Sequence, residues 1–124
     1  MWNQEADALD IKKVLTNAKA IISKPGSWVQ GTYRSHNHTC FCGLGALATA
    51  MVCEYKGVDP ATADLHAVMN NEMVGWVQDT KAGKLLATVV GVDPVDEGFQ
   101  RFNDVEGRTQ IEVLEAFDKA IAAA

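Results

Sequence analysis

The chain has 124 residues, of which 48% are apolar, so it is long enough to bury one hydrophobic core by itself. Sixteen acidic side chains against eleven basic ones give a net charge of −5. The basic residues are scattered, whereas binding to a phosphate backbone needs clustered lysines and arginines, so nucleic acid is excluded as an expected partner. We expect a single domain over residues 1–124.

The first residues and the cysteine count indicate where the protein works. Residues 1–7 have neither the basic start nor the apolar centre of a signal peptide. The longest apolar run, residues 43–53, is far shorter than the roughly twenty residues of a membrane span. An odd number of cysteines, three, favours free thiols in a reducing compartment. We therefore expect a cytoplasmic protein with no membrane partner and no disulfide.

A first helix is predicted near the N-terminus, because apolar residues recur there at intervals of three and four. Asp7 or Asp10 is placed to cap its start, and the Lys-Pro-Gly sequence at 24–26 ends it. Residues 27–34 include aromatic and β-branched residues but also a glycine, which favours an extended loop or a short strand. The apolar positions of the helix are Ile11, Val14, Leu15, Ala18, Ile21 and Ile22.

A second helix is predicted after Thr39, whose hydroxyl is suited to capping it, and Gly57 is placed to end it. Gly43 and Gly45 are poor helix formers, at a cost of about 1 kcal/mol each relative to alanine. We expect these two glycines to let another backbone segment approach closely. The buried face would comprise Phe41, Leu44, Gly45, Ala48, Met51, Val52 and Tyr55.

Two further helices are predicted in the middle of the chain. Asp59 followed by Pro60 is a typical helix start and opens a third helix, which two asparagines at 70–71 end. Thr80 is placed to cap a fourth helix, although the β-branched residues 88–90 also permit a strand. The apolar positions are Leu65, Val68 and Met69 in the third helix and Leu85, Leu86, Val89 and Val90 in the fourth.

A long loop and a last helix complete the prediction. Residues 91–107 are loop-like, because proline, glycine and asparagine interrupt any period, although Phe99 and Phe102 within them need cover. Thr109 and Glu112 form a capping box for the last helix. Five helices with one long ordered loop before the last helix make an all-α domain the expected fold. The apolar face of the last helix is Val113, Leu114, Phe117, Ala120 and Ile121.

Three separated motifs follow one another along the chain. They are Trp28-x-Gln30-Gly31, Cys42-x-Leu44-Gly45-Ala46-Leu47, and Asn103-Asp104 followed by Arg108-Thr109-x-x-Glu112-Val113-Leu114. Together they resemble the motifs of an uncharacterised family of small proteins of bacteria and bacteriophages, over most of the chain. Gly43 stands where that family usually has alanine, and Phe102 where it usually has tryptophan. The resemblance implies a single domain of bacterial or viral origin and implies no activity.

Residues 36–42 concentrate two histidines and two cysteines, which are potential zinc ligands. In an extended chain, successive alternate side chains lie about 7 Å apart. The two ends are then too distant to share one tetrahedral ion with ligand bonds of about 2 Å. We therefore expect no bound metal and no other cofactor. A zinc site formed by His36, His38, Cys40 and Cys42 is the second alternative.

Cys42 is the candidate nucleophile of the chain. Unpaired backbone amides at a helix start lower the pKa of a thiol and stabilise its thiolate. A base and an orienting group would also be needed, and His66 with Asn103 or Asp104 are the candidates. The alternative reading is a small buried side chain that packs and does not react. A cysteine-dependent hydrolase or transferase is therefore the first alternative function, and enzymatic activity stays open.

The leading hypothesis is a small, non-enzymatic binding or interaction protein. Its site would be a polar cleft formed by Trp28, Gln30, Cys42, Asn103 and Asp104. Each motif lies at a helix boundary, where backbone groups lack helical partners. We therefore expect Gln30 and the Asn-Asp pair to share one hydrogen-bonded neighbourhood with the start of the Cys42 helix. Small acidic proteins of phage origin often engage a host protein or a small molecule, so these are the expected partners.

Overall fold

The computed structural model describes residues 6–32, 40–62, 64, 77–95 and 97–124. Within these ranges the regular elements are helices, and the one extended pairing is an isolated parallel bridge between Trp28 and Phe41. The all-α prediction is therefore confirmed. The helices are α2 (Ile11–Ile21), α3 (Gly43–Lys56), α6 (Lys81–Val89), α7 (Phe99–Asn103) and α8 (Gln110–Ala123).

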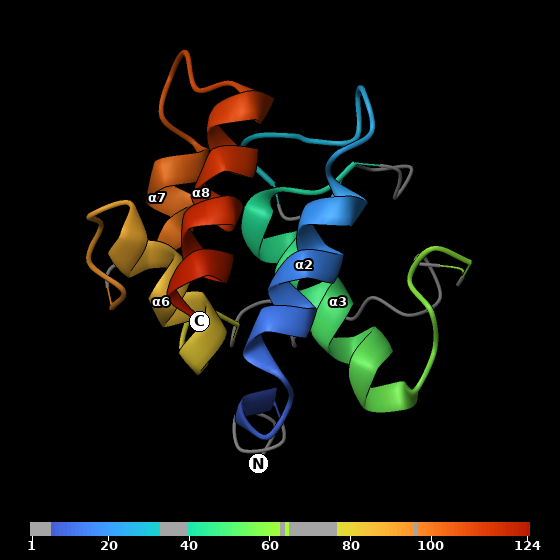
Figure 1. The fold of residues 1–124 in the computed structure, drawn as a ribbon. Coiled ribbons are helices and arrows are strands. Elements are labelled where there is room, and N and C mark those ends of the chain that lie inside the picture. Colours follow the sequence, from blue (N-terminus) through green and yellow to red (C-terminus); the bar gives the residue numbers. More distant parts are fainter. Residues whose placement is uncertain (1–5, 33–39, 63, 65–76, 96) are drawn as a thin grey trace.

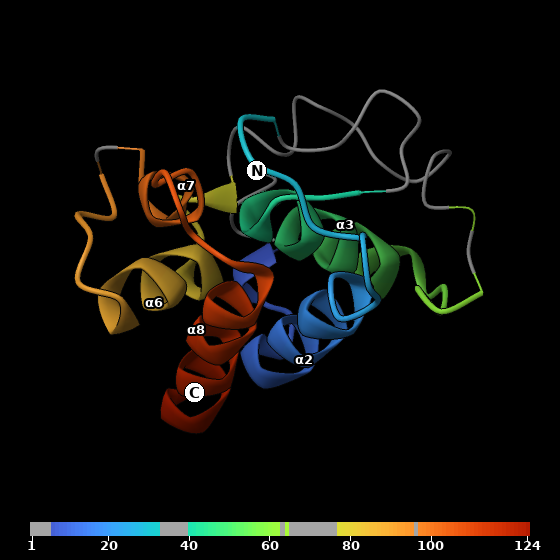
Figure 2. The same cartoon turned by 90° about the horizontal axis from the view of Figure 1, so that it is seen from above.

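Helix α3 lies at the centre of the arrangement. All of its residues from Gly43 to Cys53 are buried, and α2 and α7 both pack against it. Helix α2 packs along α3 and α8, while α7 contacts both α3 and α6. Figures 1 and 2 show α8 beside α2, with α6 and α7 together on the other side of α8. In the described part of the chain, no helix is long and apolar enough to cross a membrane.

The first helix begins where the sequence predicts. Of the two aspartates considered as caps, Asp10 has this role, since its carboxylate accepts a hydrogen bond from the amide of Lys13 at 3.1 Å. Asp7 instead accepts a hydrogen bond of 2.7 Å from the amide of Lys81. The segment before α2 therefore supplies an acceptor to the first turn of α6, where a backbone N–H has no partner within the helix.

The start of α3 differs from the prediction. Its N-cap is Cys42, whose sulfur accepts a hydrogen bond from the amide of Gly45 at 3.3 Å, and Thr39 lies outside the described residues. The chain just before Cys42 is held extended, because the amide of Phe41 donates to Ser27 and its carbonyl accepts from Val29. A helix beginning at residue 40 would break this pairing. The predicted end of the helix at Gly57, with φ of 71°, is confirmed.

A close approach is found at Gly43, but it is made by a side chain and not by the backbone segment that was expected. A Cβ atom built there would collide with the ring of Phe99, so glycine lets the first residue of α7 pack directly on α3. Phe99 is fully buried and contacts Phe117 edge-on, with ring centroids 5.9 Å apart. The predicted burial of Tyr55 is wrong, because its side chain is 53% exposed near the end of α3.

The third predicted helix falls mostly on residues outside the described ranges. At its proposed start, the carboxylate of Asp59 accepts from the amide of Ala61 at 2.9 Å, and its carbonyl accepts from Thr62 at 3.1 Å. These bonds form a turn.

The fourth predicted helix corresponds to α6. Its N-cap is Thr80, whose hydroxyl accepts a hydrogen bond from the amide of Gly83 at 3.1 Å.

The predicted loop at residues 91–107 contains a short helix, α7, that the broken hydrophobic period did not indicate. The helical turn places Phe99 and Phe102 one turn apart, with ring centroids separated by 5.3 Å. Burial of these rings offsets the poor helix signal of the surrounding residues. The sequence had shown that the two phenylalanines need cover, and α7 is how they obtain it.

The capping box of α8 is confirmed. The hydroxyl of Thr109 accepts from the amide of Glu112 at 3.3 Å, and the carboxylate of Glu112 accepts from the amide of Thr109 at 2.9 Å. Hydrogen bonds from the amide and then the hydroxyl of Thr109 lower the pKa of Glu112, since they stabilise its charged form.

We predict that Thr109→Ala lowers the free energy of unfolding by about 1 kcal/mol, because the first turn of α8 loses its side-chain acceptor. Thr109→Ser is the matched control, since serine retains the hydroxyl and should stay within about 0.5 kcal/mol of the native protein. Urea denaturation of the three proteins measures the difference. Equal stability of the alanine variant and the native protein would contradict the cap.

Candidate functional site

The side chain of Asn103 lies at the point where three segments meet. It is fully buried at the last residue of α7. Its carbonyl oxygen accepts from the indole N–H of Trp28 at 2.7 Å and from the amide of Gly43 at 3.0 Å. Its amide nitrogen donates to the carbonyl of Val29 at 3.2 Å and to the carboxylate of Asp104 at 3.0 Å. Both lone pairs and both N–H groups of this amide are therefore used.

Gln30 and Asp104 extend this arrangement toward the surface. The amide nitrogen of Gln30 donates to the backbone carbonyls of Asn103 and Val105 at 3.0 and 2.8 Å. The carboxylate of Asp104 accepts from the amide of Gly31 at 2.9 Å. The residues of the three motifs that are joined in this way, Trp28, Gln30, Gly31, Gly43, Asn103 and Asp104, are called the Asn103 network below.

Cys42 is linked to the Asn103 network through Gln100. The thiol of Cys42 donates to the side-chain carbonyl of Gln100 at 3.1 Å, and the amide nitrogen of Gln100 donates to Asp104 at 2.9 Å. The predicted convergence of Gln30, the Asn-Asp pair and the start of the Cys42 helix is therefore present. Most of the polar groups in these three segments form hydrogen bonds with one another.

The electrostatic state of Cys42 differs from the activated thiolate that the cysteine-dependent alternative requires. Burial raises the pKa of its thiol to about 12, and the nearby carboxylate of Asp104 also raises it. The amides of Gly45 and Leu44 at the helix start lower the pKa, as expected, but desolvation outweighs them. Cys42 is therefore a neutral hydrogen-bond donor near pH 7.

The other candidates for catalysis or metal binding are only partly within the described residues. His36, His38 and His66 lie outside them. The thiol of Cys40 donates to the carbonyl of Gly26 at 2.8 Å, whereas Cys42 donates to a different acceptor. Across the described ranges, no group of three or more His, Cys, Asp and Glu side chains is placed to hold a metal ion.

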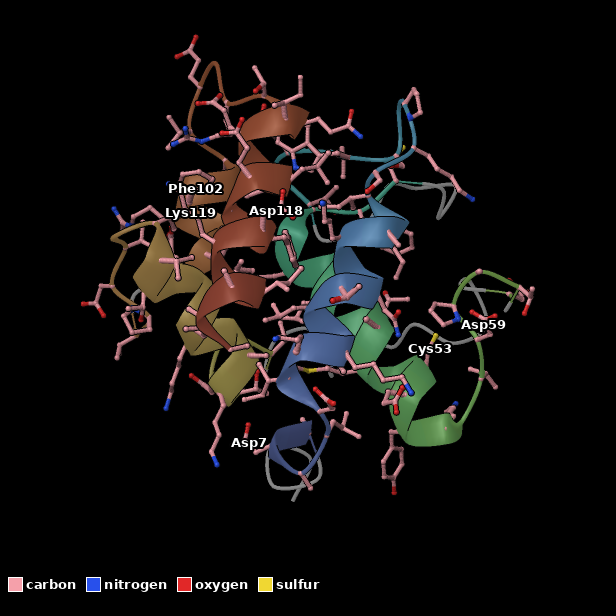
Figure 3. All side chains as sticks on the ribbon, in the orientation of Figure 1. Asp7, Cys53, Asp59, Phe102, Asp118 and Lys119 are labelled. Atoms are coloured by element: carbon pink, nitrogen blue, oxygen red, sulfur yellow. The ribbon has the colours of Figure 1, made fainter. Side chains whose placement is uncertain are left out.

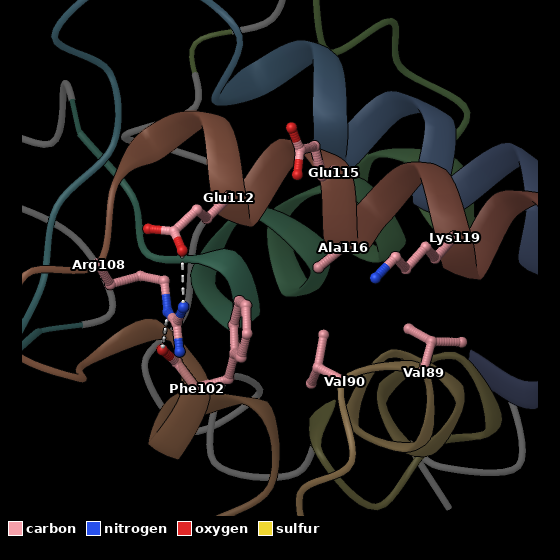
Figure 4. Close-up of a pocket in the computed structure, with 8 residues that line it drawn as sticks. All are labelled: Val89, Val90, Phe102, Arg108, Glu112, Glu115, Ala116 and Lys119. Atoms are coloured by element: carbon pink, nitrogen blue, oxygen red, sulfur yellow. Dashed lines mark hydrogen bonds and ion pairs between the residues drawn. The ribbon is translucent and has the colours of Figure 1, made fainter.

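A separate groove lies where α6, α7 and α8 meet, with a cavity volume of about 280 Å³ (Figure 4). Within it, the guanidinium of Arg108 donates to the carbonyl of Phe102 and to the carboxylate of Glu112, each at 3.0 Å. The guanidinium carbon also lies 3.7 Å from the centre of the Phe102 ring. The groove is lined by Val89, Val90, Phe102, Arg108, Glu112, Glu115, Ala116 and Lys119.

This groove was not expected from the sequence. Arg108 and Glu112 are four residues apart in the third motif, and that spacing is a signal for an ion pair at a helix start. Nothing in the local sequence shows that Val89 and Val90 of α6 complete a cavity with them. The positions of these groups depend on how α6 packs against α8.

We predict that Asn103→Ala lowers the free energy of unfolding by at least about 2 kcal/mol. The indole N–H of Trp28 and the amide of Gly43 lose their acceptor, and an unsatisfied buried group costs about 1–3 kcal/mol. Asn17→Ala on α2 is the matched control, because no side-chain hydrogen bond is found for Asn17 within the described chain. Urea denaturation of both variants tests this, and equal losses would contradict the role of the buried amide.

Comparisons with known proteins add one match. No curated protein and no solved structure shows significant similarity to the chain. Residues 6–123 match a family of unknown function, DUF6197, and this span includes all three motif segments that meet at Asn103. Because the match covers nearly the whole chain, the protein belongs to the family of unknown function DUF6197.

Proposed function

We propose that the protein is a small cytoplasmic binding protein of bacterial or bacteriophage origin, which acts on a host protein or a small molecule without covalent catalysis. The observation that carries this proposal is the state of Cys42, the candidate nucleophile, whose thiol is buried and donates to Gln100. A protonated thiol with its hydrogen already engaged is suited to packing and poorly suited to attack on a substrate.

The surroundings of Cys42 support the same proposal. A cysteine nucleophile is usually activated by a neighbouring base or cation. Within the described part of the chain, the hydrogen-bond partners of the Cys42 sulfur are instead the side-chain carbonyl of Gln100 and the amide of Gly45. Asp104 is a third neighbour, and its negative charge disfavours the thiolate. The cysteine-dependent alternative would therefore have to rely on groups outside the described residues, such as His66.

The binding role is supported by the contrast between the Asn103 network and the groove. The four hydrogen-bonding positions of the Asn103 side chain are used within the protein, which leaves none of them for a ligand. The groove beside α8 is open and combines charged with apolar side chains (Figure 4). Half of its eight lining residues are apolar and half are charged, so the groove offers both packing surface and hydrogen-bonding groups to a ligand.

We predict that Cys42 in the folded protein resists iodoacetamide well above pH 9. Its pKa is raised from 9.0 to about 12, so the neutral thiol persists over this range. Because the folded-state pKa is the higher one, the corresponding stability is present below pH 9 and is lost as the pH rises toward 12. Peptide mapping at a series of pH values, with the more accessible Cys40 as internal reference, measures the rates. Half-maximal reactivity of Cys42 near pH 7 would overturn the proposal.

A capture experiment tests the binding function directly. The native protein and Cys42→Ser are immobilised and exposed to a bacterial lysate, and the retained proteins and small molecules are identified by mass spectrometry. Serine keeps a hydroxyl that can donate to Gln100 and accept from Gly45, so the variant should fold. We predict that both proteins retain the same ligand in similar amounts. A covalent adduct on Cys42, with loss of retention in the serine variant, would establish the cysteine-dependent alternative.

A further inference from the structure

The ring of Phe102 forms one wall of the groove beside α8, and neighbouring side chains hold it in place. The ring of Phe102 packs against the fully buried Phe99 on one side and beneath the guanidinium of Arg108 on another. The guanidinium is itself fixed by hydrogen bonds to the carbonyl of Phe102 and the carboxylate of Glu112. In Figure 4 the ring stands between Arg108 and the open part of the groove. An aromatic surface is therefore presented to the groove with little freedom to move.

The groove also has an apolar part beside its charged residues. Val89 and Val90 at the end of α6 face the small side chain of Ala116 on α8 across the cavity (Figure 4). Ala116 is almost fully buried, so this position forms the floor. Together with the Phe102 ring, these side chains provide a surface that favours a flat or branched hydrocarbon group over water.

Of the two cations that line the groove, Arg108 forms an ion pair with another lining residue and, among the described residues, Lys119 does not. Arg108 and Glu112 neutralise one another at 3.0 Å. Lys119 extends along the groove toward Val90, whereas the carboxylate of Glu115 points away from Lys119 at the other edge of α8 (Figure 4). Among the described residues, no ion pair of Lys119 is found, while Asp118 next to it binds Lys19 of α2 at 2.6 Å. Figure 3 labels both Asp118 and Lys119 on α8.

We propose that this groove binds a small organic monocarboxylate, whose apolar part packs on Phe102 and Val90 and whose carboxylate is bound by Lys119. The proposal rests on the binding function proposed above and names its ligand class. A single negative charge fits best, because Lys119 is a lining cation without an ion pair among the described residues, whereas Glu112 and Glu115 repel a second negative charge. A cavity of about 280 Å³ suits a molecule with one ring and a short chain.

The proposal is tested with 3-phenylpropionate as the probe. Amide resonances of the complete, isotope-labelled protein are recorded during titration, and the probe should shift those of residues 89–90, 102 and 115–119 in a saturable way. The neutral analogue 3-phenylpropanamide has the same apolar part and should bind roughly fivefold more weakly, as expected for loss of one exposed ion pair. The cation 3-phenylpropylamine and the dianion phenyl phosphate should bind more weakly than the carboxylate. Equal affinity for the acid and the amide would overturn the proposal.

Three variants locate the charge that matters. Lys119→Gln should reduce the affinity for 3-phenylpropionate to that for the amide, and Lys119→Arg should retain the affinity of the native protein. Lys12→Gln, at an exposed lysine on α2 remote from the groove, should change nothing. An unchanged affinity in Lys119→Gln, or probe shifts confined to other parts of the protein, would refute the assignment.

The two proposals fail in different ways. If the material captured from lysate shifts resonances outside the groove, the groove assignment fails while the binding function stands. If Cys42 carries a covalent adduct, the binding function itself fails, whatever the carboxylate titration shows.

Discussion

The structure depends on one buried primary amide. The side chain of Asn103 contacts the Trp28 segment, the first residue of α3 and its own neighbour Asp104 through four hydrogen bonds. A buried amide is costly unless all its groups are paired, so the segments are held in the one arrangement that pairs them. The amide thereby fixes an extended segment, which has little regular structure of its own, against the end of α7.

The position of α7 follows from this constraint. Gly43 is the residue whose amide reaches Asn103, and it is also the residue without a side chain under the ring of Phe99. Gly43 therefore permits both the hydrogen bond to Asn103 and the packing of the Phe99 ring. A Cβ at this position would push the ring outward and lengthen the hydrogen bond to Asn103. Helix α7 has five residues, and such a short helix is not stable alone in water. Its stability comes from these contacts.

Local signals in the sequence predicted most of the helices, and non-local contacts explain where prediction failed. Caps at Asp10, Thr80 and Thr109 act within three residues of their own position, so spacing alone reveals them. The start of α3 was misplaced because a pairing with a distant segment keeps the preceding residues extended. The three motifs identified the segments that converge. The spacing of residues within each motif could not predict the hydrogen bonds to Asn103, because its partner Trp28 lies 75 residues away. The groove was missed for the same reason, because α6, α7 and α8 each supply part of it.

Helix α7 also connects the buried network with the groove. Consecutive residues of a helix point in directions roughly 100° apart, so Asn103 turns inward to Trp28 while Phe102 turns toward α8. Arg108 binds the backbone carbonyl of Phe102 and stacks on its ring, which ties the start of α8 to the same short helix. The motif residues at 103–104 and at 108–112 therefore have complementary tasks: the first group sets where α7 sits, and the second fixes the aromatic wall that α7 presents. Because Asn103 is bonded directly to Phe102, a displacement of Asn103 would also displace the aromatic wall of the groove.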